Sequence, residues 1–238
     1  MHVSRRRARQ RHLLFLLLIG MISLARAQTE RKTVEDRVQE FGAIVQERLA
    51  PKFAAAGVSY PPQRLTFVGL KQERVLQVYA AGADGEFRHI CDYAILAASG
   101  VLGPKLREGD RQVPEGIYRV PSLNPNSKFH LSLRLDYPNE FDSAKAAAEE
   151  RMDPGTDIMI HGNAVSIGCV AVGDPAAEDL FVLAALTGIE NITVILAPVD
   201  FRTSELPPLP SQTPAWAGEI HAQVKQELAR YPTPVAEQ

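Results

Sequence analysis

The chain has 238 residues, 45% of them hydrophobic, and a formal net charge of −2. This length and composition predict one globular domain with extensions rather than two full domains. The weak net charge argues against a nucleic-acid partner, because binding to a phosphate backbone requires a surplus of Lys and Arg.

Residues 1–27 have the three parts of a secretory signal peptide. A basic region from Arg5 to Arg11 precedes an apolar run at 13–24 and the small-residue pattern Ala25-Arg26-Ala27. The apolar run is shorter than the roughly 20 residues needed to span a bilayer. We therefore expect export to the periplasm or cell envelope with cleavage after Ala27. An uncleaved N-terminal anchor is the alternative.

Residues 28–60 are predicted to contain an amphipathic helix that packs against the main domain. The apolar positions recur at helical spacing and are Val34, Val38, Phe41, Val45 and Leu49. Thr33, followed three residues later by Asp36, predicts a capping box. Pro51 is expected to end or kink the helix, because proline removes a backbone donor.

Residues 61–200 are dominated by short runs of β-branched and aromatic residues, interrupted by two predicted helices at 143–152 and 174–188. Asp174 is expected to be the N-cap of the second helix. The predicted strands are 65–70, 74–81, 87–97, 116–120, 130–137, 157–162 and 192–197. The first three should be consecutive antiparallel strands. The pattern predicts a mainly β core with flanking helices (α+β), in which the strands form a sandwich or a barrel-like core.

Residues 201–238 change character again. A proline-rich linker at 204–214 precedes a predicted helix whose apolar face carries Trp216, Ile220, Val224 and Leu228. This helix is expected to pack on the domain, and contact with a partner is the alternative.

The stretch from His161 to Cys169 is the candidate catalytic segment. His161 ends an apolar run and Gly162 lets the chain turn at once, before Ser166-Ile167-Gly168-Cys169 supplies a thiol. Thiol chemistry needs a thiolate, a nearby base and donors for an oxyanion, and this segment offers all three. By composition alone, a structural thiol in the apolar run that follows fits equally well.

The chain has two cysteines, Cys91 and Cys169. In an oxidising compartment they can form a single disulfide. The alternative is a reactive Cys169 with Cys91 as a small buried hydrophobic residue, and the apolar run around Cys91 favours it.

The sequence HGNAVSIGCVAVGD, which begins at His161, resembles the signature of the L,D-transpeptidase (YkuD-like) family, in which an HG strand precedes an S-x-G-C loop. Residues 99–120 resemble the family's segment that leads into a P-x-G-x-Y turn. Residues 129–142 resemble the strand and loop before the HG, particularly in the YafK-like branch. Ile167 replaces the usual histidine and the HG-to-cysteine spacing is short, and both departures fit that branch.

The resemblance implies a role for each residue of the segment. Cys169 is the nucleophile and His161 the general base. Ser166 and Gly168 shape the loop, and the amides of Gly168 and Cys169 hold the oxyanion. A backbone carbonyl near Gly162 orients the imidazole.

The resemblance also places His130 and Tyr137 near the substrate cleft, although an ordinary strand histidine explains His130 equally well. No cofactor is implied, because a thiol and an imidazole suffice. A zinc site formed by His130, His161 and Cys169 is a rival, but the sequence has neither HExxH nor CxxC spacing, so we expect no metal.

The implied chemistry is acyl transfer on peptidoglycan stem peptides, in cell wall biogenesis and cell shape. Cys169 attacks a carbonyl of meso-diaminopimelate, and an amine or water resolves the thioester. The alternatives to a transpeptidase are a hydrolase that releases a wall-linked lipoprotein and a non-catalytic peptidoglycan-binding module.

Overall fold

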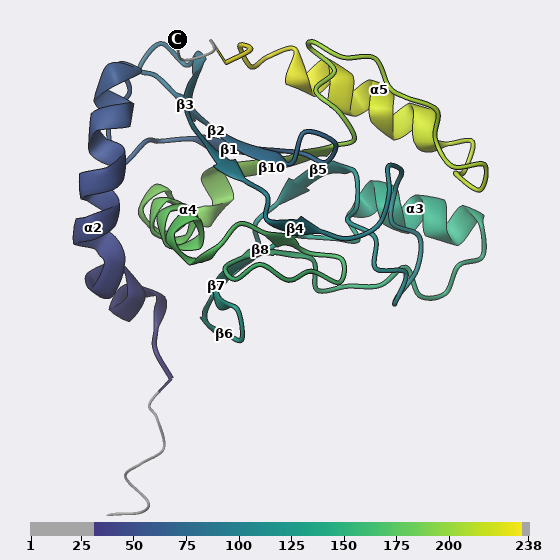
Figure 1. Ribbon diagram of the computed structural model, residues 1–238, viewed down its shortest axis with the longest axis horizontal. Helices are drawn as coiled ribbons and strands as arrows, with labels where there is room; N and C mark the ends of the chain where they lie inside the picture. Colours follow the sequence, from purple (N-terminus) through teal and green to yellow (C-terminus); the bar gives the residue numbers. More distant parts are fainter. Residues whose placement is uncertain (1–30, 235–238) are drawn as a thin grey trace, which may run out of the picture. The chain divides into compact units, whose positions relative to one another are not determined.

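The structure is a computed structural model that describes residues 31–234. The predicted signal peptide at 1–27 lies outside the described residues. From Thr33 onward the chain forms one compact unit of two sheets and four α-helices within the described range (Figure 1). Within residues 31–234 no helix combines the length and the apolar character needed to cross a bilayer.

The first sheet has five strands in the order β3-β2-β1-β10-β5. Their bounds are β1 Leu65–Leu70, β2 Val75–Ala81, β3 Phe87–Ala94, β5 Gly116–Arg119 and β10 Ile192–Ala197. β1 and β10 are parallel, and the other neighbours are antiparallel. The prediction that the first three strands are consecutive antiparallel neighbours is confirmed.

The second sheet has five strands in the order β4-β9-β8-β7-β6. Their bounds are β4 Ala97–Ala98, β6 Ser122–Ser127, β7 His130–Arg134, β8 Met159–His161 and β9 Val170–Ala171. β8 and β9 are parallel, and the other neighbours are antiparallel. Both sheets remain open among the described residues, so the core is an α+β sandwich and not a closed barrel.

The helices cover the sheets on different sides (Figure 1). Their bounds are α2 Val34–Ala55, α3 Glu140–Ala148, α4 Asp174–Thr187 and α5 Ala217–Leu228, with a short 3-10 helix, η1, at Ile189–Asn191. α2 and α4 contribute to the main core together with both sheets. α5 packs on the other face of the first sheet through Ile220, Val224 and Leu228. This confirms the predicted packing of the C-terminal helix.

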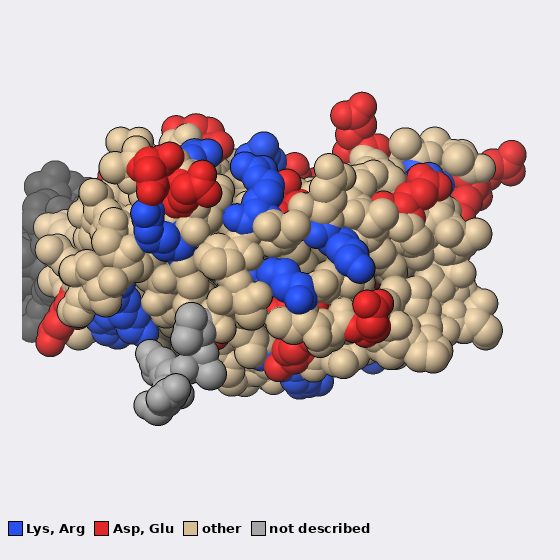
Figure 2. Space-filling model, turned by 90° about the horizontal axis from the view of Figure 1, so that it is seen from above, with Lys and Arg blue, Asp and Glu red and all other residues tan. Residues whose placement is uncertain are grey.

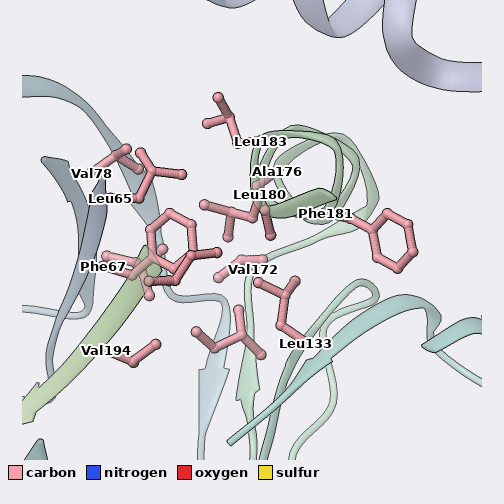
Figure 3. Close-up of a cluster of buried hydrophobic side chains, with 14 of the residues drawn as sticks. Leu65, Phe67, Val78, Leu133, Val172, Ala176, Leu180, Phe181, Leu183 and Val194 are labelled. Atoms are coloured by element: carbon pink, nitrogen blue, oxygen red, sulfur yellow. The ribbon is translucent and has the colours of Figure 1, made fainter. Parts of the chain in front are cut away.

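The central strand β1 is buried along its whole length because both of its faces are covered. Leu65 and Phe67 point into the main core, and Val68 and Leu70 face α5. Figure 3 shows Leu65 and Phe67 beside Leu180 of α4. Burying each such side chain fully contributes about 1.5–3 kcal/mol. Because the side chains of β1 alternate between its two faces, the same strand packs against the main core on one side and against α5 on the other.

The capping box of Thr33 and Asp36 is confirmed. Pro51 does not end α2, and the predicted start of the next helix and the predicted N-cap of α4 are wrong. α2 continues through Pro51 to Ala55, because burial of Phe53 outweighs one missing hydrogen bond. The helix predicted at 143–152 begins earlier, since Asn139 caps it. Gly173, not Asp174, is the N-cap of α4.

The charged side chains are mixed on the face shown in Figure 2, where Lys and Arg lie among Asp and Glu. Neither sign forms a continuous patch on that face. Specificity is therefore to be sought in individual side chains and cavities rather than in a broad field of one sign.

Candidate active site

The candidate nucleophile and base come from adjacent parallel strands. His161 ends β8, and Cys169 directly precedes β9, with Ile160 paired to Val170. In this register His161 pairs with Ala171, so Cys169 lies two residues before the partner of His161. Ile160 and Val170 point into the core. Alternation therefore places His161 and Cys169 together on the opposite face of the sheet.

The imidazole of His161 is held in one orientation. Its Nδ1 lies 2.6 Å from the carbonyl oxygen of Gly162. A carbonyl only accepts a hydrogen bond, so Nδ1 carries the proton and Nε2 has the free lone pair. The ring also stacks on Phe129, with centroids 4.6 Å apart. The carbonyl partner is the one that the family resemblance implied, and it leaves Nε2 able to accept a proton.

The environment of His161 keeps the imidazole neutral. The side chain is buried, and burial lowers its pKa from the ordinary 6.5, although the bond to Gly162 acts in the opposite direction. A neutral imidazole at pH 7 is the form that a general base requires.

The thiol of Cys169 is half-buried and rests in its protonated form. Burial raises its pKa above the ordinary 9.0, against the effect of a hydrogen bond with the backbone of Met159. Its Sγ lies 3.6 Å from the carbonyl oxygen of Asp157. No hydrogen bond joins Cys169 to His161 in the part of the chain that the structure describes. The thiol must therefore turn from Asp157 toward the imidazole before it can transfer a proton.

Ser166 fixes the loop that carries the thiol. Its Oγ donates to the carbonyl oxygen of Cys169 at 2.6 Å and accepts from the amides of Gly168 and Ser99. The predicted shaping role of Ser166 thus has a direct geometric basis. The Gly168 amide, however, is not free, because it donates to Ser166 at 3.2 Å. The roles of the Gly168 and Cys169 amides in holding an oxyanion stay predictions.

Gly162 is required by close packing behind the imidazole. A Cβ at this position would lie 2.5 Å from Oδ1 of Asp174 and 2.7 Å from the carbonyl oxygen of Phe129. The same Oδ1 accepts from the Asn163 amide at 2.7 Å. Asp174 therefore holds the turn after His161 instead of capping α4. Sequence reasoning missed this role and the stacking of Phe129, because both depend on contacts between distant segments.

His130 and Tyr137 each make contacts with other parts of the fold. The Nε2 of His130 lies 3.0 Å from Oε1 of Glu178 on α4, and its ring packs edge-on against Phe41 of α2. Tyr137 is buried, and its hydroxyl donates to the carbonyl oxygen of Pro154 at 2.9 Å. These contacts are those of packing residues, and a role in the cleft stays a prediction for both.

Cys91 is buried in β3, and burial raises its pKa to about 11. Both cysteines are free, so the disulfide alternative is wrong. Among residues 31–234 no group of three or more His, Cys, Asp or Glu side chains is arranged to hold a metal ion. The imidazoles of the suggested zinc set bond elsewhere, His130 to Glu178 and His161 to Gly162.

Residues 58–195 match the model of the YkuD family, the L,D-transpeptidase catalytic domain. The match covers more than half of the 238 residues, so the chain belongs to this family. The resemblance drawn from the three motifs is thereby confirmed.

Two relatives from Escherichia coli, strains K12 and O157:H7, carry the name "Putative L,D-transpeptidase YafK". Each is 35% identical over 113 residues, which are 47% of this chain and 43% of the relative. The match therefore spans less than half the length of these relatives.

The fold is also similar to two solved structures. The helical cell shape determining protein Pgp2 from Campylobacter jejuni has a TM-score of 0.47 and 18% identity, over 77% of this chain and 61% of that one. Bd1075 from Bdellovibrio bacteriovorus has a TM-score of 0.42 and 20% identity, over 74% and 58%.

Proposed function

We propose that this chain is an exported cysteine acyltransferase of the L,D-transpeptidase type that acts on peptidoglycan stem peptides in the periplasm. Membership of the YkuD family supports the reaction class. The predicted signal peptide at 1–27 supports the location. The proposed place of the activity is cell wall biogenesis, with a contribution to cell shape.

The observation that carries the proposal is the pairing of β8 with β9. It places a neutral histidine with a free Nε2 on the same face of one sheet as a half-buried cysteine. The alternative of a non-catalytic binding module needs neither this register nor the fixed tautomer. The presence of both the strand register and the fixed tautomer of His161 therefore favours an enzyme.

The proposed reaction has two steps. Nε2 of His161 takes the proton of the Cys169 thiol as the sulfur attacks the carbonyl carbon of meso-diaminopimelate. The carbon–sulfur bond forms, the carbon–nitrogen bond breaks, and the imidazolium returns the proton to the leaving amine. An incoming nucleophile then attacks the thioester, and its proton passes through His161 to regenerate the thiol.

The acceptor in the second step decides the biological outcome. An amine acceptor gives a cross-link or attaches a protein lysine. Water gives a hydrolase, and release of a wall-linked lipoprotein is the form of it that the resemblance to the YafK-like branch implies. Exclusion of water from the cleft favours the amine.

Mass spectrometry of the protein without residues 1–27, incubated with disaccharide-tetrapeptide, tests the proposal. A thioester adduct is expected in the wild type and in Cys91→Ala, and none in Cys169→Ala. A cross-linked product identifies an amine acceptor, and a disaccharide-tripeptide identifies water. If the wild type forms no adduct and its products equal those of Cys169→Ala, the binding module replaces the enzyme.

A further inference from the structure

A cavity of about 440 Å³ lies between the segment before β5 and the proline-rich segment before α5. Its volume is within the range of sites that hold small ligands, about 300–1,000 Å³. One side is formed by residues between 100 and 112, and the other by residues between 210 and 214. The second side lies outside residues 58–195, which match the family domain.

The cavity adjoins the loop that carries the thiol. Gln112 lines it, and its carbonyl oxygen lies 3.5 Å from where a Cβ of Gly168 would be. Ser99, which precedes the lining residue Gly100, donates its amide to Ser166 of the thiol loop. The cavity and the loop that carries Cys169 are therefore direct neighbours in the fold.

The cavity is preformed rather than collapsed. The Gln112 side chain accepts from the Val101 amide at 2.9 Å and donates to the carbonyl oxygen of Gly103 at 2.7 Å. Lys71 donates to the same carbonyl oxygen at 3.1 Å. On the opposite side, Thr213 approaches Gly103, whose Cβ would lie 3.6 Å from its Oγ1. Both sides are thus fixed by contacts within the fold.

The charges that line the cavity favour an anion. Asp110 is already neutralised, since Lys105 donates to its Oδ1 at 2.6 Å and the amides of Leu106 and Arg107 donate to its Oδ2. Arg107 is an exposed lining residue, and its guanidinium makes no hydrogen bond or ion pair with any residue from 31 to 234. A free guanidinium beside a saturated carboxylate is suited to a carboxylate ligand, which it binds through two parallel hydrogen bonds.

We propose that this cavity is a binding subsite for a carboxylate of the peptide substrate, with Arg107 as its anchor and the 210–214 segment as one side. The inference rests on the proposed function for the identity of the peptide. The proline residues of the C-terminal segment and the apolar side chains of Val101, Leu102 and Leu106 provide contacts for the aliphatic part of that peptide.

Calorimetry with Cys169→Ala protein, which binds without turnover, tests the subsite. The probes are the disaccharide-tetrapeptide with free carboxyl groups and the same compound with its carboxyl groups amidated. The Cys169→Ala protein, which is the parent of the variants below, is expected to bind the compound with free carboxyl groups on the order of tenfold more tightly than the amidated compound. Arg107→Gln should lose this preference. Arg230→Gln, which removes one positive charge elsewhere on the surface, should keep it.

A second variant tests the side formed by the C-terminal segment. Gln212→Trp adds bulk at an exposed lining position and should weaken both probes while leaving the unfolding midpoint unchanged. Equal affinities in the parent, Arg107→Gln and Gln212→Trp would overturn the subsite.

Adduct formation, measured on proteins that retain Cys169, separates the two proposals. Binding that depends on Arg107 without any adduct supports the subsite and contradicts acyl transfer. An adduct formed equally in wild type and Arg107→Gln, with equal affinities, supports acyl transfer and rejects the subsite.

Discussion

The Nε2 of His221 lies 2.7 Å from Oε2 of Glu115, and both side chains are buried. The other carboxylate oxygen accepts from Lys71 and from the amide of Gly103. A residue of α5 thereby completes the bonding of a carboxylate that holds the segment lining the cavity. The C-terminal helix is part of the support of the site, not an appendage.

His221→Ala should lower the free energy of unfolding by about 1–3 kcal/mol, because it leaves a buried carboxylate oxygen without a partner. Urea denaturation measures this. Gln226→Ala on the same helix is the control, because Gln226 is exposed and alanine favours helix. Equal midpoints for the two variants would contradict the importance of the buried pair.

Gly162→Ala should destabilise the protein by about 1–3 kcal/mol, because the new methyl group meets Asp174 and the backbone of Phe129. Thermal unfolding measures the change. Gly218→Ala is the matched control. Nothing lies within 4 Å of its Cβ position, and alanine is preferred in a helix, so a gain of about 0.5–1 kcal/mol is expected. A loss in Gly162→Ala no larger than in the control would show that the turn relaxes without cost.

Local signals in the sequence predicted most of the fold. β1 and β10 have the predicted bounds, and the capping box of α2 is formed. β6 was missed because its sequence, SLNPNS, is polar and contains Pro125. Such a strand is stable at the edge of a sheet, and in the described part of the chain β6 pairs only with β7. A tertiary position, not a propensity, makes it a strand.

The candidate site was predictable only in part. The local order of His161 and Cys169 indicated the pair, and the register of β8 and β9 supports it. The orientation of His130 toward Glu178 and the cavity beside Gln112 depend on segments far apart in the chain. No spacing within one segment carries that information.

Cys169 should react slowly with iodoacetamide at neutral pH, because the thiolate is the nucleophile and burial raises the pKa above 9.0. The rate should rise about tenfold per pH unit up to that pKa. Peptide mapping by mass spectrometry measures it. Cys91 is the internal control, since burial raises its pKa to about 11, and it should react later. Rapid modification of Cys169 at pH 7 would mean that its resting form is a thiolate.

The pH dependence of thioester formation should report on His161. Burial lowers the pKa of this imidazole below 6.5, so the base stays neutral to lower pH than an exposed histidine. The acylation rate should therefore fall as the pH decreases, with a midpoint below 6.5, and be constant from there to neutral pH. Mass spectrometry of samples quenched at fixed times, between about pH 4 and pH 8, measures the midpoint.

His161→Gln keeps a polar side chain in place but removes the base, so acylation at neutral pH should slow by about 10²–10⁴-fold and lose that midpoint. His89→Gln is the control, because His89 is paired with Asp92 on β3, in the other sheet, and should leave the profile unchanged. A midpoint above 6.5 in the wild type, or the same profile in His161→Gln, would assign the proton transfer to a different group. The thiol of Cys169 would then need a base that its neighbouring strand does not supply.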